Sequence, residues 1–166
     1  MVTDPEMLRI RGYLQSQAAA RSVEELIGRV QDGVDDLAAA AGTIAPASRQ
    51  VVPPGETWSP TDCLRHAVGS DMAVAAQILH VALTGELPQR SDADLPQSFE
   101  ALLPAHAAAM DSLYAHVREA DPAGFLSVTW EHPMFGDLNW REWLLFLRIH
   151  AKDHAQQLRA MQAAAG

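Results

Sequence analysis

Hydrophobic residues recur every three or four positions in several long stretches of the chain, which is the spacing of amphipathic helices. The first stretch ends in an apolar stripe made by Val23, Leu26, Ile27, Val30, Val34, Leu37 and Ala41. Upstream of this stripe the pattern fades, so the helix begins near Pro5 as an extended or a separate piece. Gly42 and Pro46 end the stretch, because neither residue favours a helix interior.

Three further helices follow, separated by loops rich in proline, glycine and polar residues. The second is predicted to run to about residue 84, since Ser59 is a good N-cap and Pro60 suits the first helical position. The third is expected over about 99–120, and the fourth over about 140–163. Four amphipathic helices with connections of about 15 residues and no convincing strand predict an all-α fold. We expect a four-helix bundle with long connections, formed as one domain over residues 1–166, with the order of its helices left open.

The net charge of the chain makes some classes of binding partner less suitable than others. Lys and Arg number 12 against 21 Asp and Glu, which gives a formal net charge of −9, and Lys152 is the single lysine. An acidic chain with no basic run is poorly suited to nucleic acid or to anionic lipid. We expect no signal peptide and no membrane span, because no long uncharged apolar run occurs. The single cysteine, Cys63, excludes an internal disulfide framework and suits a cytoplasmic protein.

The seven histidines are the main candidates for chemistry. The inward face of the last helix is expected to carry Trp143, Leu147, His150, His154, Gln157 and Met161. His150 and His154 are therefore one turn apart on one face, a spacing that lets two imidazoles bind one metal ion. A hydrogen-bonded pair of core histidines explains the spacing equally well, so the pattern alone leaves both interpretations open.

The other histidines are harder to interpret singly. His66 lies among small residues of the second helix, where a metal ligand is possible but a core or surface residue is the commoner case. His106 falls on the apolar face of its helix, which favours a core histidine over a pocket residue. His80 and His116 are expected to have no role in a site, and His132, in a loop, is expected to be exposed or to face the mouth of a pocket.

Several known motifs are absent. The zincin motif H-E-x-x-H requires glutamate where Ala151 stands, and the inverted motif is matched only by the shorter Asp153. No Glu-x-x-His occurs, which excludes a di-iron bundle of the ferritin type. Cys63 lies one turn from His66, but a core cysteine is a better interpretation than a nucleophile.

Two segments of the chain together resemble the DinB-like (also YfiT-like) superfamily of helix bundles. They are Trp58-Ser59-Pro60 ahead of His66, and FGDLNWREWLLFLRIHAKDHAQQL in the last helix and its approach. The resemblance covers about residues 58–158. It implies a four-helix bundle of unusual connectivity that holds a divalent metal, typically nickel or zinc, through three histidines.

Carried over by position, these three metal ligands are His66, His150 and His154. The resemblance also implies transferases or isomerases that use mycothiol or bacillithiol, or hydrolases, and it implies a homodimer. This chain departs from a metalloenzyme with a glutamate base, because no glutamate lies beside the paired histidines. Asp153 is expected instead to orient a ligand histidine from behind.

The leading hypothesis is therefore a metal-dependent enzyme that activates a water or a low-molecular-weight thiol against a small-molecule substrate. The residues expected around the opening of its site are Cys63, Ser70, His106, Trp143 and Gln157. One alternative is a non-enzymatic bundle that binds a metal or a small ligand, associated with stress. Another is a metal-free bundle whose histidines are structural.

Overall fold

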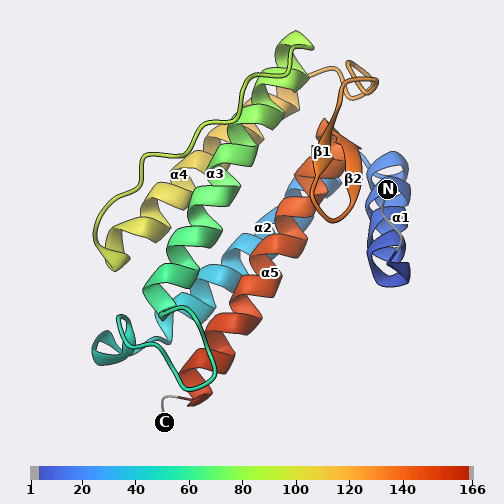
Figure 1. Cartoon of the computed structure of the whole chain (residues 1–166). Helices are drawn as coiled ribbons and strands as arrows, with labels where there is room; N and C mark the ends of the chain where they lie inside the picture. The colour runs from blue at the N-terminus through green and yellow to red at the C-terminus, as the bar shows by residue number, and fades with distance from the viewer. Residues whose placement is uncertain (1–3, 165–166) are drawn as a thin grey trace.

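The computed structural model describes residues 4–164 and consists mainly of helices (Figure 1). Its elements are α1 (Pro5–Ala20), α2 (Val23–Gly42), the short 3₁₀ turn η1 (Pro46–Ser48), α3 (Pro60–Thr84), α4 (Phe99–Glu119), β1 (Thr129–His132), β2 (Gly136–Asn139) and α5 (Trp140–Ala164). The predicted all-α bundle is confirmed, and α3, α4 and α5 have nearly the predicted bounds. One alternative that the sequence left open is resolved, and one prediction at the level of elements needs correction.

The structure decides between the two alternatives for the N-terminal stretch, because it forms two separate helices. Arg21 has an extended backbone, and Ser22 begins α2 with a capping box. The Ser22 hydroxyl accepts from the Glu25 amide at 3.2 Å, while the Glu25 carboxylate accepts from the Ser22 amide at 2.8 Å. α1 therefore packs as a separate helix against α5, outside the four-helix bundle (Figure 1).

The bundle itself contains α2, α3, α4 and α5, with contacts between α2 and α5, α3 and α4, α3 and α5, and α2 and α4. Figure 1 shows that the 85–98 connection runs back along the bundle, so that α3 and α4 point in the same direction. α2 and α5 both run the opposite way. This connectivity resolves the helix order that the sequence left open, and it sets α3 beside α5.

A polar layer divides the hydrophobic core into two parts. One part surrounds the hairpin end of the bundle, and the other surrounds the end near Cys63. On α3 the break between them falls at Asp71, on α4 at His106, and on α5 at His150. Polar side chains from three helices therefore meet at one level of the bundle.

The correction concerns the segment before α5, which contains a short antiparallel hairpin. β1 pairs with β2 from Thr129 opposite Asn139 to His132 opposite Gly136. The ring nitrogen Nδ1 of His132 accepts hydrogen bonds from the amides of Met134 at 3.1 Å and Phe135 at 3.3 Å. His132 is only 7% exposed, which corrects the expectation of an exposed loop residue.

The buried His132 predicts a pH-dependent stability. Burial lowers the pKa of His132 to about 4, against about 6.5 in an unfolded chain, so the unfolded state binds the proton first on acidification. The contribution of neutral His132 to the stability of the fold is complete above the pKa of the unfolded chain, and it is lost as the pH falls towards 4. Between about pH 7 and about pH 5, the free energy of unfolding of wild-type protein should fall by about 2 kcal/mol more than that of His132→Asn. Urea unfolding at the two pH values measures both changes. The asparagine oxygen can accept from the same turn without titrating, so equal losses in both proteins would contradict this origin.

Among the described residues, one helix is long and apolar enough to cross a membrane. This helix is α3, and 56% of its most apolar window is buried inside the fold. Such a helix is equally characteristic of a protein core, so the finding is weak evidence for a span.

Candidate metal centre

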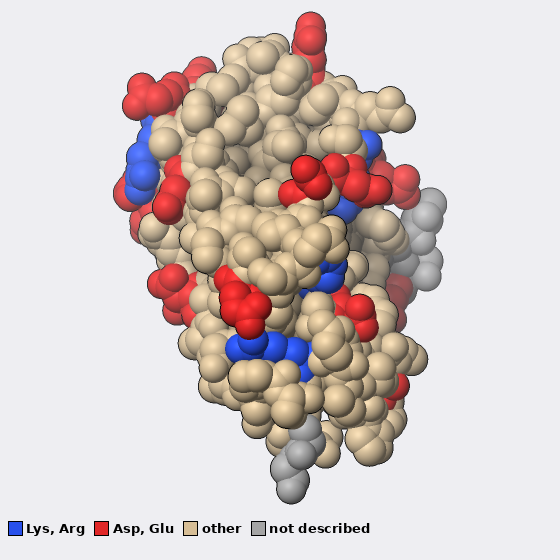
Figure 2. Space-filling model, turned by 90° about the vertical axis from the view of Figure 1, so that its left-hand side faces the viewer, with Lys and Arg blue, Asp and Glu red and all other residues tan. Residues whose placement is uncertain are grey.

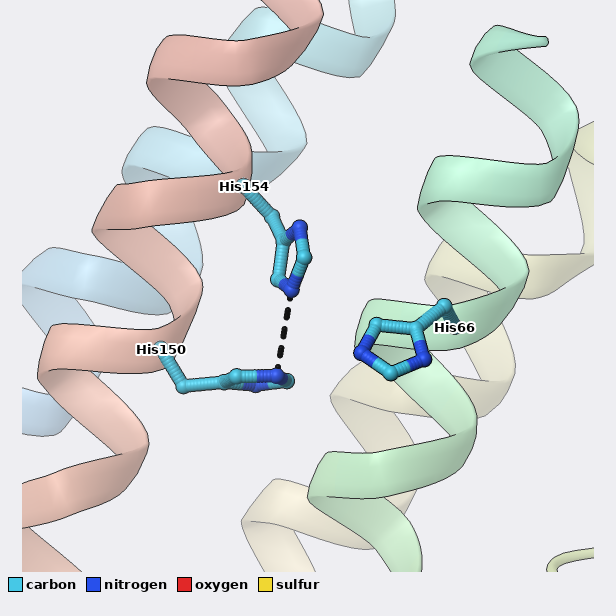
Figure 3. Close-up of side chains that lie close together, drawn as sticks. All are labelled: His66, His150 and His154. Atoms are coloured by element: carbon cyan, nitrogen blue, oxygen red, sulfur yellow. Dashed lines mark hydrogen bonds between the residues drawn. The ribbon is translucent and has the colours of Figure 1, made fainter. Parts of the chain in front are cut away.

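Three histidines from two adjacent helices converge in the space between α3 and α5 (Figure 3). His66 comes from α3, and His150 and His154 come from consecutive turns of α5. One ring nitrogen of each lies within 4.8 Å of those of the other two. The helix pattern placed the α5 pair on one face, and the packing of α3 on α5 brings His66 to them.

Trp58 explains part of the sequence pattern that precedes α3. Its ring packs on His66 with 4.8 Å between the ring centroids. Ser59 then begins α3 with a capping box, in which its hydroxyl accepts from the Asp62 amide at 3.2 Å. The tryptophan and the cap therefore fix both the start of α3 and the position of the His66 ring.

The hydrogen bonds of His150 and His154 fix which ring nitrogen of each carries the proton. The Asp71 carboxylate accepts from Nδ1 of His150 at 2.7 Å, and the Gln157 side-chain oxygen accepts from Nδ1 of His154 at 3.0 Å. Both rings then present an unprotonated Nε2, because a neutral imidazole carries one proton. These two Nε2 atoms face each other at 3.1 Å.

Two lone pairs at this distance repel each other unless a cation or a proton lies between them. Zinc binds imidazole nitrogen at about 2.0–2.1 Å, so tetrahedral geometry separates two ligand nitrogens by about 3.3 Å. The spacing of His150 and His154 is close to that value. The three-histidine group therefore fits a divalent metal ion in its donor types and spacing, and the lone pairs of His150 and His154 face each other.

The charge state of the histidines also suits a metal. Burial lowers the pKa of His154, and the neighbouring His150 lowers it further. His66 is more exposed, and its partial burial lowers its pKa as well, again assisted by His150. Metal binding requires neutral imidazole, so surroundings that oppose protonation favour the ligand form.

Asp71 is a member of this group that the sequence analysis missed. It is 1% exposed and accepts from Nδ1 of His150 through Oδ1 and from Nε2 of His106 at 2.9 Å through Oδ2. Burial alone would raise the pKa of Asp71, but the hydrogen bonds from the two histidines outweigh it and hold the pKa below its ordinary value. The available signal was a single acid in the apolar middle of α3, although it does not reveal the partners.

The expectation for Asp153 is corrected by the same contacts. Asp153 is exposed at the rim of the site, and among the described residues the carboxylate behind His150 is that of Asp71. Asp153 is not among the residues that helical spacing places on the inward face of α5. A carboxylate from the neighbouring helix occupies the place behind the ligand instead.

A cavity of about 590 Å³ opens beside the histidines, and its volume lies within the range of small-molecule sites. His66 and His150 line it, together with Ser70 and Trp143 from the expected opening. His106 lies outside it, bonded to Asp71.

Cys63 and Gln157, also expected at the opening, lie behind His154. The Cys63 thiol is 3.4 Å from Oε1 of Gln157 and 3.7 Å from Nδ1 of His154, on the ring edge opposite Nε2. Burial raises the pKa of this thiol to about 12, so it stays protonated near neutral pH. The location and the charge state make Cys63 a packing residue of the site and a poor nucleophile.

Aromatic side chains form one wall of the cavity. Trp143 stacks on Trp130 with 5.4 Å between centroids, and Phe146 meets the edge of Trp143 at the same distance. His132 from the hairpin completes this wall against Phe146. Polar residues line the cavity as well, and among them Arg90 donates to the Ser70 hydroxyl at 3.3 Å.

The surface in Figure 2 carries acidic side chains at several points, with Lys and Arg in small separate groups. The described residues of this face form no continuous basic surface.

The sequence profile of the DinB superfamily matches residues 11–158 of the chain. Solved structures that match the chain include two that share its fold. The crystal structure of TT2238, a four-helix bundle protein, has 25% sequence identity and a TM-score of 0.60 over 84% of this chain and 99% of that one. A mutant of the mycothiol-dependent maleylpyruvate isomerase has 16% identity and a TM-score of 0.63 over 85% of this chain, which spans only 62% of the isomerase chain. The second likeness is one of fold alone. A search of curated proteins found no match.

Proposed function

The chain belongs to the DinB superfamily, and on that premise we propose that it is a metal-dependent enzyme acting on a small molecule. His66, His150 and His154 hold one divalent ion, and the neighbouring cavity holds the substrate. The observation that carries this proposal is the pair of Nε2 atoms, 3.1 Å apart, each with its Nδ1 bonded to an acceptor. A group of lone pairs arranged in this way beside a cavity is typical of a metal site with an open position.

A divalent ion held by three neutral imidazoles supplies Lewis acidity, which lowers the pKa of a bound water or thiol. The residues of the chain do the remaining work. The wall of Trp143 and Phe146 removes water from an apolar substrate and limits its orientations. Ser70 and Arg90, which also line the cavity, provide hydrogen-bond donors. A low-molecular-weight thiol as cosubstrate, in a transferase or isomerase reaction, is part of the proposal, as is a hydrolase reaction with water.

Zinc or nickel is the proposed metal. Three imidazole nitrogens suit both ions, and the order of affinities for divalent metals does not separate them strongly, so cellular supply decides between them. The buried Asp71 adds one negative charge near the group, which favours a dication over a monocation.

One observation favours a non-enzymatic alternative, in which the bundle only binds a metal or a small ligand. The carboxylates that line the cavity, Glu6 and Asp153, are both exposed, so neither has the burial that tunes a carboxylate to act as a base near neutral pH. An enzyme of this kind would depend on the metal itself and on a cosubstrate for its proton transfers.

Titration of metal-free protein with zinc or nickel is expected to give one bound ion per chain. Isothermal titration calorimetry measures the stoichiometry, and elemental analysis of the purified protein identifies the ion acquired in the cell. Absence of specific binding for both metals would reject the proposal and leave the histidines as structural residues. With binding established, an activity screen of thiol cosubstrates and hydrolase substrates decides between the enzyme and the binding protein, since activity that requires the metal excludes the second.

A further inference from the structure

We propose that Asp71 and His106 are positioning residues that set the tautomer of His150 and, through it, the affinity of the site for metal. The metal part of this inference rests on the proposed function, whereas the tautomer part does not. The three side chains come from three different helices, α3, α4 and α5, and meet in the polar layer of the core.

The hydrogen-bond donors and acceptors of this layer determine the tautomer of His150. An ionised carboxylate can only accept hydrogen bonds, so Nδ1 of His150 and Nε2 of His106 must each carry a proton towards Asp71. With its proton on Nδ1, His150 has a lone pair on Nε2, the atom that faces His154. Asp71 therefore selects the one neutral tautomer of His150 that can bind metal through Nε2.

The second step concerns basicity. A carboxylate bonded to the remote N–H of a ligand imidazole orients the ring and makes the ligating nitrogen a stronger donor. Gln157 performs the same orienting function for His154, but as a neutral amide it polarises the ring less. The two ligands of α5 are therefore unequal, and His150 is the more strongly supported.

The third step gives His106 its role. His106 is 1% exposed and does not line the cavity, so it lies outside the group of metal ligands. It holds the second oxygen of Asp71, and without it the buried carboxylate would have one hydrogen bond fewer and greater freedom to turn. Substitution of His106 should therefore weaken metal binding without removing any ligand.

Nitrogen NMR of the histidine side chains in metal-free protein tests the tautomer directly. In wild-type protein the His150 signals should report a protonated Nδ1 and an unprotonated Nε2, with the assignment made from His150→Gln. In Asp71→Leu the protonated Nδ1 should be lost or reduced to a minor form, since its acceptor is gone. Asp71→Asn retains an acceptor oxygen of the same shape and should retain the tautomer. Asp71→Ala also lacks an acceptor, and it replaces the leucine variant if that one does not fold.

Metal titrations of the same proteins test the second part. Loss of the Asp71 charge in Asp71→Asn should lower zinc or nickel affinity by about 10- to 100-fold, as do comparable changes behind metal ligands. His106→Leu should also lower the zinc or nickel affinity. His106→Gln, which can still donate to Asp71, should have a higher affinity than His106→Leu. Met110→Ala is the matched control, because Met110 is buried in the next turn of α4 and makes no hydrogen bond to this group.

The outcomes separate the two proposals. A wild-type protein that binds neither metal overturns the proposed function, whatever the tautomer. A His150 tautomer that is unchanged in Asp71→Leu overturns the role of Asp71, even if metal binds. Equal losses of affinity in His106→Leu and Met110→Ala would assign the effect of His106 to core stability alone and overturn its positioning role.

Discussion

A His150→Ala variant should bind zinc or nickel more than about 100-fold more weakly than wild-type protein, because changes merely behind a ligand already cost about 10- to 100-fold. The substitution removes one of the two Nε2 atoms that face each other, and it also removes the partner of the Asp71 carboxylate at 2.7 Å. Competition with a chelator of known affinity measures the change. His154→Ala should also weaken binding strongly, but by less than His150→Ala, because a neutral amide supports the His154 ring.

His116→Ala is the matched control for these variants. His116 is also a helical histidine, but it is exposed and donates only to the Ser112 carbonyl one turn earlier. Its replacement should leave metal affinity unchanged. If His150→Ala and His116→Ala retain equal affinity, the metal is bound elsewhere and the three-histidine assignment is wrong. The folded fraction of each metal-free variant must be measured alongside, because Asp71 loses a buried partner in the first.

The largest effect on stability is expected at Trp140, the first residue of α5. This side chain is 0% exposed, and its indole N–H donates to the Gly124 carbonyl at 2.9 Å. Trp140→Ala should lower the free energy of unfolding by about 3–5 kcal/mol, since it leaves a large cavity between the hairpin and the bundle. Urea unfolding of metal-free protein measures the change.

Trp140→Phe separates the two contributions of this side chain. Phenylalanine fills most of the volume but cannot donate to the Gly124 carbonyl, so the expected loss is smaller than in Trp140→Ala. At a temperature where both variants are folded, metal affinity should match that of wild-type protein, because Trp140 does not line the cavity. Equal stability of Trp140→Ala and wild-type protein would contradict the packing that the structure gives to this end of the bundle.

The helices of the bundle could be predicted because local signals mark them. Ser59 and Pro60 defined the start of α3, and apolar spacing defined the lengths of α4 and α5. The break between α1 and α2 also had a local signal, the capping box from Ser22 to Glu25, but an apolar pattern that faded gradually concealed it. The hairpin was missed because its strands have four residues each, too few for alternation to be evident.

Part of the candidate site could also be predicted from the sequence, again from local signals. His150 and His154 could be paired because helical geometry relates positions four residues apart, and His66 was added only through resemblance. Asp71 could not be paired with His150, since they are 79 residues apart and meet only through the packing of α3 on α5. For His132 the alternative of a residue facing a pocket fits the structure, since it lines the cavity. Its burial was not predicted, because its ring accepts from the backbone in a tight turn, a role that residue type alone does not indicate.

The polar layer has a consequence for how the bundle is aligned. Helices with cores of Leu, Val and Ala can slide past each other by one turn and still bury similar apolar surfaces, so such contacts discriminate poorly between alignments. A slide of α3, α4 or α5 by one turn would carry Asp71 away from His106 or His150 and leave a charge buried without its partners. We infer that this layer fixes the register of the three helices, in the way that one buried asparagine fixes the register of a coiled coil.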